Sequence, residues 1–221
     1  MIDCYNRFEP FNHLLIDNFL SADLLRSIEN EFWDFKDSKW DKFGSMFYNE
    51  HAEKKQMYEL EKMPPSIQQF YSICTSKNFL DSLSKMSGLS VEKYSFYGAG
   101  MNIYSKDASL SAHTDFNFND EIKAYRCLNL LLYLNKDWNE SHGGCLQMFS
   151  SDLKKTVDIF PLSNRLVIFP TNNNTPHGVS KVLSNVQRRS LSLYYYSVEC
   201  PPDTKEDPHR TIWKGPATQQ K

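Results

Sequence analysis

The sequence lacks the features that direct a chain to a membrane or to an oxidising compartment. Its 221 residues contain no apolar run near the length of about 18 residues that a membrane-spanning helix needs. The five cysteines are odd in number, widely spaced and without a CxxC pair, which disfavours a disulfide framework or a thiolate zinc site. The first residues, MIDCYNRFEP, show neither the basic nor the apolar part of a signal peptide. We therefore expect a cytoplasmic chain with reduced thiols and no membrane partner.

A charge surplus and an excess of glycine are also missing. The formal net charge is −2, so the chain has no general electrostatic attraction for nucleic acid, and we expect no nucleic-acid partner. Glycine occurs only 8 times, whereas aromatic residues make up 14% of the chain, which disfavours low complexity and disorder. A chain of this length and composition favours one domain with a sizeable core.

The first part of the chain favours helices. Ser21 is a suitable N-cap for the segment that follows it, ADLLRSIENEFWDF, whose apolar residues recur at helical spacing. A second helix is expected to begin at Pro64-Pro65, because proline is favoured in the first helical turn. A third, NFLDSLSKMSG, is expected to end at Gly88. We therefore expect residues 1–90 to form a helical support region.

From Val91 onward, short apolar and aromatic runs alternate with turn residues. Strands in series without intervening helices predict an antiparallel sandwich or barrel, with the preceding helices packed on the outside of one sheet. The expected class is α+β, mainly β, with a β core at 91–200 that forms one domain with 1–90, and an irregular tail at 201–221. The runs that predict strands are YSFYGAGMNIY, CLNLLLYL, CLQMF, TVDIF, RLVIF and SLSLYYYSV.

Three histidine and aspartate residues suggest a metal site. His113 and Asp115 are two apart, so on a strand their side chains point to the same face. His177 lies just past the apolar run RLVIF, 62 residues after Asp115. Two histidines and one carboxylate are the ligands that hold iron(II) with open coordination positions. The alternatives are a surface pair at His113 and Asp115 and a loop histidine at 177.

The last predicted strand carries an arginine on an otherwise polar face. Arg188 and Ser190 share a face, opposite Leu191. A guanidinium that faces the inside of a barrel suits a bound carboxylate, which it contacts with two parallel hydrogen bonds. A slip of one residue would place Arg189 inside instead, and an exposed strand start would leave both arginines in solvent.

The order of these features resembles the Fe(II)- and 2-oxoglutarate-dependent dioxygenases, specifically the prolyl 4-hydroxylase-like branch that includes the prolyl hydroxylases of hypoxia-inducible factor. The resemblance covers residues 94–198. It is carried by the metal-binding order, by RCLNLLLYLNKDW at 126–138 followed by Gly143-Gly144, and by His177-Gly178-Val179. It implies a double-stranded β-helix, the jelly-roll or cupin-like core. The spacing from His177 to Arg188 is two residues longer than in the hypoxia-type enzymes.

The resemblance also implies roles for individual residues. His113, Asp115 and His177 would bind Fe(II), and Arg188 with the help of Tyr133 would bind the distal carboxylate of 2-oxoglutarate. The remaining residues of the cosubstrate pocket would be Tyr104, Ser190, Leu131 and Asn129. The implied reaction is hydroxylation of an unactivated C–H bond by O2, coupled to decarboxylation of 2-oxoglutarate to succinate, with ascorbate as a possible reductant.

The substrate is less constrained than the chemistry. A prolyl or other peptidyl hydroxylase is the first expectation, and a hydroxylase of an amino acid, a sugar or a biosynthetic intermediate is the alternative. A non-catalytic jelly-roll binding module is a further one. An open groove at 40–62 would favour a peptide, whereas a closed lid would favour a metabolite; the aromatic residues expected there are Trp40, Phe43, Phe47 and Tyr48. The sequence leaves the oligomeric state open.

Overall fold

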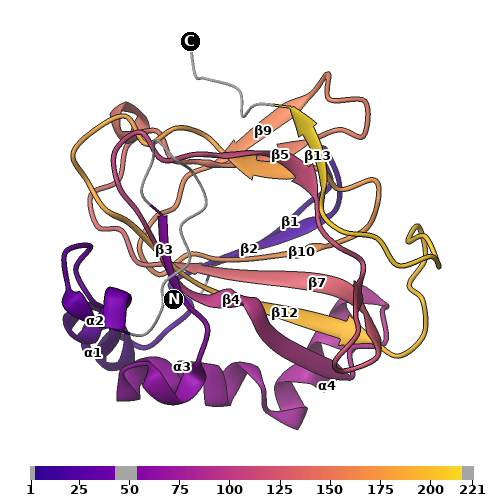
Figure 1. Cartoon of the computed structure of the whole chain (residues 1–221), viewed down its shortest axis with the longest axis horizontal. Helices are drawn as coiled ribbons and strands as arrows, with labels where there is room; N and C mark the ends of the chain where they lie inside the picture. Colours follow the sequence, from indigo (N-terminus) through magenta and orange to yellow (C-terminus); the bar gives the residue numbers. More distant parts are fainter. Residues whose placement is uncertain (1–2, 43–53, 216–221) are drawn as a thin grey trace.

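The computed structural model describes residues 3–42 and 54–215, which form two antiparallel sheets that face each other (Figure 1). The larger sheet has the order β1 (Asp3–Arg7), β2 (His13–Asp17), β10 (Leu166–Pro170), β7 (Ala124–Tyr133), β12 (Arg188–Ser197), β4 (Lys93–Tyr104) and β3 (Lys54–Met57), with β6 (Phe118–Asn119) also paired to β7. The smaller sheet has the order β13 (Ile212–Gly215), β5 (Leu110–Thr114), β11 (His177–Val179), β8 (Leu146–Phe149) and β9 (Thr156–Ile159). The expected mainly β jelly-roll class is confirmed.

The helices lie on the outer face of the larger sheet, as expected (Figure 1). They are α1 (Ala22–Glu31), α2 (Ser38–Lys42), α3 (Pro65–Cys74) and α4 (Lys77–Ser87), with single 3-10 turns at Leu60–Lys62 and Glu140–His142. Ser21 accepts a hydrogen bond from the Leu24 amide at the start of α1, and Gly88 ends α4 with a left-handed φ of 72°. Within the described part of the chain, no helix is long and apolar enough to cross a bilayer.

The larger sheet has a different role on each face, because side chains alternate along β7 and β12. On the outer face, Leu130 and Leu193 are fully buried in the core shared with the helices. The Tyr71 hydroxyl of α3 donates to the Ser192 carbonyl at 3.1 Å and fixes the helix to this sheet. On the inner face, Tyr133 and neighbouring residues turn toward the smaller sheet. Each fully buried leucine contributes about 1.5–3 kcal/mol, so the helices stabilise the sheet that carries one side of the site.

The region 1–90 is not only helical, which corrects the sequence expectation. β1 and β2 form a hairpin along one edge of the larger sheet, and β3 pairs with β4 at the other edge. The strand sequences DCYNR and KKQM are short and polar, so they lack the alternation that predicts strands. Gly100 allows β3 to approach, because a Cβ at this position would lie 2.0 Å from the Met57 carbonyl oxygen.

The tail at 201–221 is not wholly irregular, which is a second correction. β13 pairs with β5, and its Trp213 lies opposite His113. The structure does not decide between the open groove and the closed lid at 40–62, but the Trp40 indole is fully buried against Phe32 and Trp33 and lines no groove. The other aromatic residues named for that segment, Phe43, Phe47 and Tyr48, and the terminal PATQQK lie outside the described residues.

Candidate metal centre and adjoining pockets

The three predicted metal ligands come together at the smaller sheet. His113 is on β5, Asp115 follows that strand directly, and His177 opens β11. His177 is paired in register with His113, so the two imidazole centroids are 4.5 Å apart. Nε2 of His113 is 3.5 Å from Oδ1 of Asp115, and Nε2 of His177 is 3.4 Å from Oδ2. His177 is thus a strand residue and not a loop residue.

Both imidazoles are oriented by the backbone. Nδ1 of His113 lies 2.8 Å from the Ser111 carbonyl oxygen, and Nδ1 of His177 lies 3.1 Å from that of Thr175. A carbonyl only accepts, so Nδ1 must carry the proton in each ring. Nε2 is then the unprotonated nitrogen of each neutral imidazole, and it points toward Asp115. This hydrogen bonding prepares a histidine to bind a metal through Nε2.

The spacing of these atoms fits a small divalent cation. One ligand atom from each of the three residues lies within 4.8 Å of the other two. An ion about 2.1 Å from nitrogen and oxygen ligands has neighbouring ligand atoms about 3 Å apart, close to the separations found here. Two imidazoles and one carboxylate on one side of an ion leave its other positions open, which suits iron(II).

Asp115 is held by two residues of β7. The Asn129 amide donates to Oδ2 of Asp115 at 2.9 Å, and the Arg126 guanidinium lies 3.0 Å from the same oxygen. The guanidinium also donates to Oδ1 of Asn129 through two nitrogens at 2.7 and 3.0 Å, and it stacks on the Tyr194 ring with 3.4 Å from Cζ to the centroid. Arg126 is 1% exposed. The carboxylate therefore has a fixed orientation toward the two histidines.

The role of Arg126 could not be derived from strand alternation. Positions 126 and 129 have opposite parity, so a regular strand would point them to opposite faces. In the structure, Tyr195 pairs with Leu128 and Tyr196 pairs with Arg126, which leaves Cys127 as an extra residue on β7. This β-bulge shifts the alternation and brings both Arg126 and Asn129 to Asp115.

The electrostatics keep Asp115 charged. Burial by itself would raise the pKa of this carboxyl, but the positive charge of the Arg126 guanidinium beside it outweighs burial. The pKa is consequently well below its usual range. A carboxylate that stays ionised at neutral pH is a ready metal ligand.

Replacement of Arg126 by methionine is expected to weaken metal binding about 10- to 100-fold, because the ligand Asp115 loses the group that orients it. Lysine at this position should restore part of the affinity, since it keeps the charge without the two-pronged contact to Asn129. Anaerobic titration calorimetry with Fe(II) measures this. Arg165 is a matched control, because it forms an equivalent pair with Asp17 at 2.6 and 2.8 Å on β2. If Arg126→Met kept wild-type affinity, Asp115 would be positioned without it.

The larger sheet faces this triad with a cationic group. Arg188 on β12 is 2% exposed, and its Nε donates to the Gly144 carbonyl at 2.6 Å. Its Nη2 lies 3.4 Å from the Tyr133 hydroxyl, and its guanidinium centre is 5.2 Å from the Tyr104 ring. Arg189 points to the other face, where it pairs with Asp34. Arg188 therefore faces the cavity and Arg189 does not, which is the orientation that strand parity predicts.

The tyrosine hydroxyls beside Arg188 stay protonated. Burial raises the pKa of Tyr133 to about 12, against the opposing effect of the Arg188 charge. Burial likewise raises the pKa of Tyr104, again against Arg188. At neutral pH the Tyr133 hydroxyl thus keeps its proton and is able to donate a hydrogen bond to an acceptor.

A cavity of about 80 Å³ connects the triad to Arg188. All the residues predicted to bind the metal or the cosubstrate line it except Tyr133, which is fully buried with its ring centroid 5.0 Å from the Arg188 guanidinium. Lys54 of β3 also lines the cavity, and the sequence interpretation missed it. The lining includes Lys54, Tyr104, His113, Asp115, Asn129, Leu131, His177, Arg188 and Ser190.

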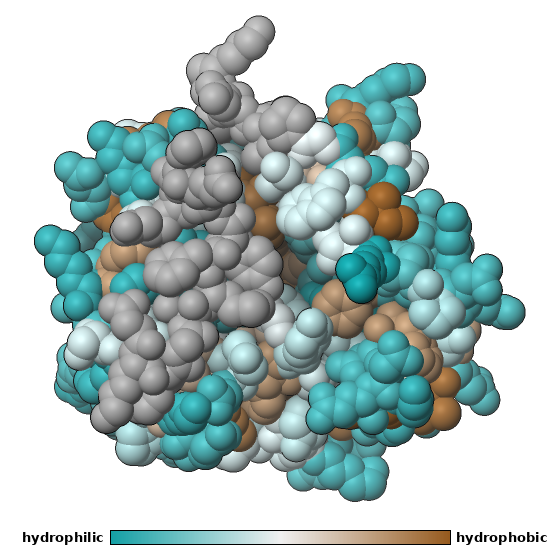
Figure 2. All heavy atoms as spheres, viewed as in Figure 1, coloured by the Kyte–Doolittle hydropathy of each residue, from teal (hydrophilic) through white to brown (hydrophobic). Residues whose placement is uncertain are grey.

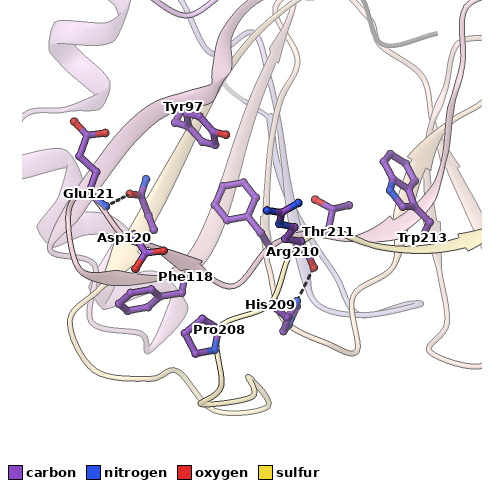
Figure 3. Close-up of a pocket in the computed structure, with 11 residues that line it drawn as sticks. Tyr97, Phe118, Asp120, Glu121, Pro208, His209, Arg210, Thr211 and Trp213 are labelled. Carbon is purple, nitrogen blue, oxygen red and sulfur yellow. Dashed lines mark hydrogen bonds between the residues drawn. The ribbon is translucent and has the colours of Figure 1, made fainter. Parts of the chain in front are cut away.

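A larger pocket of about 880 Å³ adjoins the triad on the outside. Figure 3 shows that Tyr97 of β4, Phe118 of β6 and Trp213 of β13 surround it, with Pro208 and Arg210 of the tail between them. Two of its lining residues are neighbours of the triad, because Trp213 lies 5.1 Å from the His113 ring between centroids and Phe116 directly follows Asp115 in the sequence. The space-filling view shows apolar side chains in a recess of an otherwise largely hydrophilic face (Figure 2).

The comparisons with known proteins agree with this geometry. Residues 99–196 match the model of the 2OG-Fe(II) oxygenase superfamily. The chain is 32% identical to the prolyl hydroxylase EGLN3 of Mus musculus over 75 residues, which are 34% of this chain and 30% of that protein. It is 29% identical to the prolyl 3-hydroxylase OGFOD1 of Mus musculus over 90% of this chain and 36% of that protein. The chain thus spans about a third of the length of these relatives.

Solved structures show the same fold. A prolyl-4-hydroxylase from Pseudomonas putida superposes with a TM-score of 0.64 at 22% identity, over 83% of this chain and 91% of that one. A prolyl hydroxylase from Trichoplax adhaerens, in complex with a peptide fragment of hypoxia-inducible factor, gives a TM-score of 0.58 at 19% identity and covers 83% of each chain. At these identities the likeness concerns the fold.

Proposed function

We propose, from the premise that this chain belongs to the 2OG-Fe(II) oxygenase superfamily through residues 99–196, that it is an Fe(II)- and 2-oxoglutarate-dependent oxygenase that hydroxylates an unactivated C–H bond. The observation that carries the proposal is that one cavity is lined by metal-ligand candidates and also by a buried guanidinium. The triad His113, Asp115 and His177 is at one end, and Arg188 with Tyr104 is at the other. This arrangement suits a short dicarboxylate that contacts a metal at one end and a guanidinium at the other.

Each residue has a defined part in the proposed reaction. The triad would hold Fe(II) through two Nε2 atoms and the Asp115 carboxylate, and Arg126 and Asn129 would keep that carboxylate in place. Arg188 and Tyr133 would bind the distal carboxylate of 2-oxoglutarate, with Ser190 and Leu131 along its length. When bound, the iron and the cosubstrate supply the oxidising chemistry, in which O2 is used and succinate and CO2 are released. Ascorbate is the proposed external reductant.

The proposed substrate is a prolyl or other peptidyl residue. Several relatives are named as prolyl hydroxylases, and one solved neighbour holds a peptide. The outer pocket supports a peptide by its own chemistry, because aromatic side chains line it on several sides and aromatic grooves bind extended proline-containing segments. Its volume of about 880 Å³ also exceeds the needs of a free amino acid. We include a cytoplasmic location in the proposal, since Cys74, Cys127, Cys145 and Cys200 are free thiols.

The experiment is a turnover assay with purified protein, Fe(II), 2-oxoglutarate and ascorbate. Succinate formation is measured first with no added substrate, then with a library of proline-containing peptides and a matched library without proline. Mass spectrometry detects a gain of one oxygen atom on the peptide. Peptide-dependent succinate with oxygen on proline is the expected result. Stimulation by small metabolites alone would replace the peptide assignment, and failure to bind 2-oxoglutarate would overturn the enzymatic proposal in favour of a binding module.

A further inference from the structure

The chain segment at 205–209 is held in place by one buried asparagine. The Asn117 side chain donates to the carbonyls of Lys205 and Asp207 at 2.7 and 3.0 Å, and its Oδ1 accepts from the His209 amide at 2.7 Å. The backbone amide of Asn117 also donates to the His209 carbonyl at 3.4 Å. Asn117 is 4% exposed, so water competes little for these contacts. The segment therefore has a fixed position beside the chain that follows β5.

The next residue along the chain, Arg210, is presented to the outer pocket from this fixed position. Ile212 pairs with Thr114 in the ladder of β13 and β5, and the backbone contact just described continues the same antiparallel register three residues away. This register places Arg210 opposite Phe116, which directly follows Asp115. Both Arg210 and Phe116 line the outer pocket, and Figure 3 shows the Arg210 side chain there. Arg210 thus enters the pocket from a segment that is registered on both sides of Asp115.

The Arg210 guanidinium is exposed and has no carboxylate partner in residues 3–42 and 54–215. The acidic residues of the same pocket, Asp120 and Glu121, belong to the turn between β6 and β7, and neither is within ion-pair distance of Arg210. Asp120 pairs instead with Lys123 at 3.3 Å. A guanidinium in a pocket with aromatic walls is matched by a ligand carboxylate, which it contacts with two parallel hydrogen bonds.

We infer that Arg210 binds a carboxylate of the peptide substrate, so that the enzyme prefers an acidic residue close to the hydroxylated one. The inference rests on the proposed function and deepens it, because it names the charge of the substrate. Tyr97, Phe118 and Trp213 would contact the apolar part of the peptide. Since Arg210 lies opposite Phe116, the acidic residue would be within a few positions of the residue at the metal.

The test compares peptides that differ only in the charge of one side chain. Each peptide is acetylated, amidated and contains one proline, with aspartate, asparagine or lysine at one of the two positions before or after it and alanine elsewhere. Succinate formation with Fe(II) and 2-oxoglutarate gives kcat/KM for each peptide. The wild type is expected to have a kcat/KM about fivefold higher for the best aspartate peptide than for its asparagine counterpart, as for an exposed charge pair.

Two substitutions test whether Arg210 causes this preference. Arg210→Gln should remove it, and Arg210→Glu should reverse it in favour of the lysine peptide. Damage to the fold would lower kcat/KM for all peptides alike, so it does not produce a reversal. Lys214→Gln is the matched control and should keep the aspartate preference, because Lys214 is an exposed cation on β13 that does not line the outer pocket.

The outcomes separate the inference from the proposed function. Equal kcat/KM for aspartate and asparagine peptides in the wild type would overturn the inference while the hydroxylation of peptides stands. An unchanged aspartate preference in Arg210→Gln would overturn it as well, because another group would then bind the carboxylate. If the wild type turned over none of the peptides, the peptide assignment itself would fail, and the inference with it.

Discussion

Replacement of His177 by alanine is expected to abolish metal binding and succinate formation together. The substitution removes one of three ligand groups and leaves only the His113 and Asp115 side chains on one side of the ion. It also removes the imidazole whose Nδ1 contact to the Thr175 carbonyl fixes its orientation. Anaerobic calorimetry with Fe(II) and a succinate assay on the same preparation measure both effects.

The control is a histidine that lies away from the cavity. His142 belongs to the single turn at Glu140–His142, where its side chain accepts a hydrogen bond from the Asn139 amide. His142→Ala should keep full metal binding and turnover. Thermal unfolding of both variants shows whether the fold is intact. Wild-type iron affinity in a folded His177→Ala protein would disprove the assignment of the triad.

Replacement of Arg188 by methionine is expected to raise the Kd for 2-oxoglutarate about a hundredfold, with little change in the affinity for the metal. The reason is that a buried carboxylate which loses its charged partner retains the cost of desolvation without the compensating contact. Of the two predicted contacts to the distal carboxylate, the Tyr133 hydroxyl would remain, 3.4 Å from the former position of the Arg188 Nη2. Calorimetry with Mn(II)-loaded protein measures the Kd directly.

The neighbouring arginine provides the control. Arg189 has the same side chain on the same strand, but it faces the helices and pairs with Asp34. Arg189→Met should lose that surface contact and bind 2-oxoglutarate with wild-type affinity. The reverse outcome, with weak binding in Arg189→Met and normal binding in Arg188→Met, would show that the strand is one residue out of register in solution.

The sequence predicts those parts of the site that depend on local pattern. The alternation in SLSLYYY places Ser190 and Leu191 on opposite faces, and the structure has Ser190 in the cavity and Leu191 in the helix-covered core. The helix ends at Ser21 and Gly88 follow from capping chemistry that acts within a few residues. His113 and Asp115 share a face through their spacing of two.

The remaining parts depend on register between distant strands, which local pattern does not specify. Arg126 reaches Asp115 because of the bulge at Cys127, and nothing in RCLNLLL marks that position as irregular. Lys54 lies in a four-residue polar strand whose assignment requires β4 as its partner. The packing of β13 on β5 likewise depends on a pairing between residues about 100 positions apart in the sequence.

The pairing of β13 with β5 gives the metal site an intrinsic fluorophore. Three of the four tryptophans, Trp33, Trp40 and Trp138, are buried, whereas Trp213 is 56% exposed. Its indole is also the one that lies 5.1 Å from the His113 ring. Emission that iodide quenches from the aqueous phase should therefore report mainly Trp213, and we expect that emission to change when an ion binds at His113, without any label or turnover.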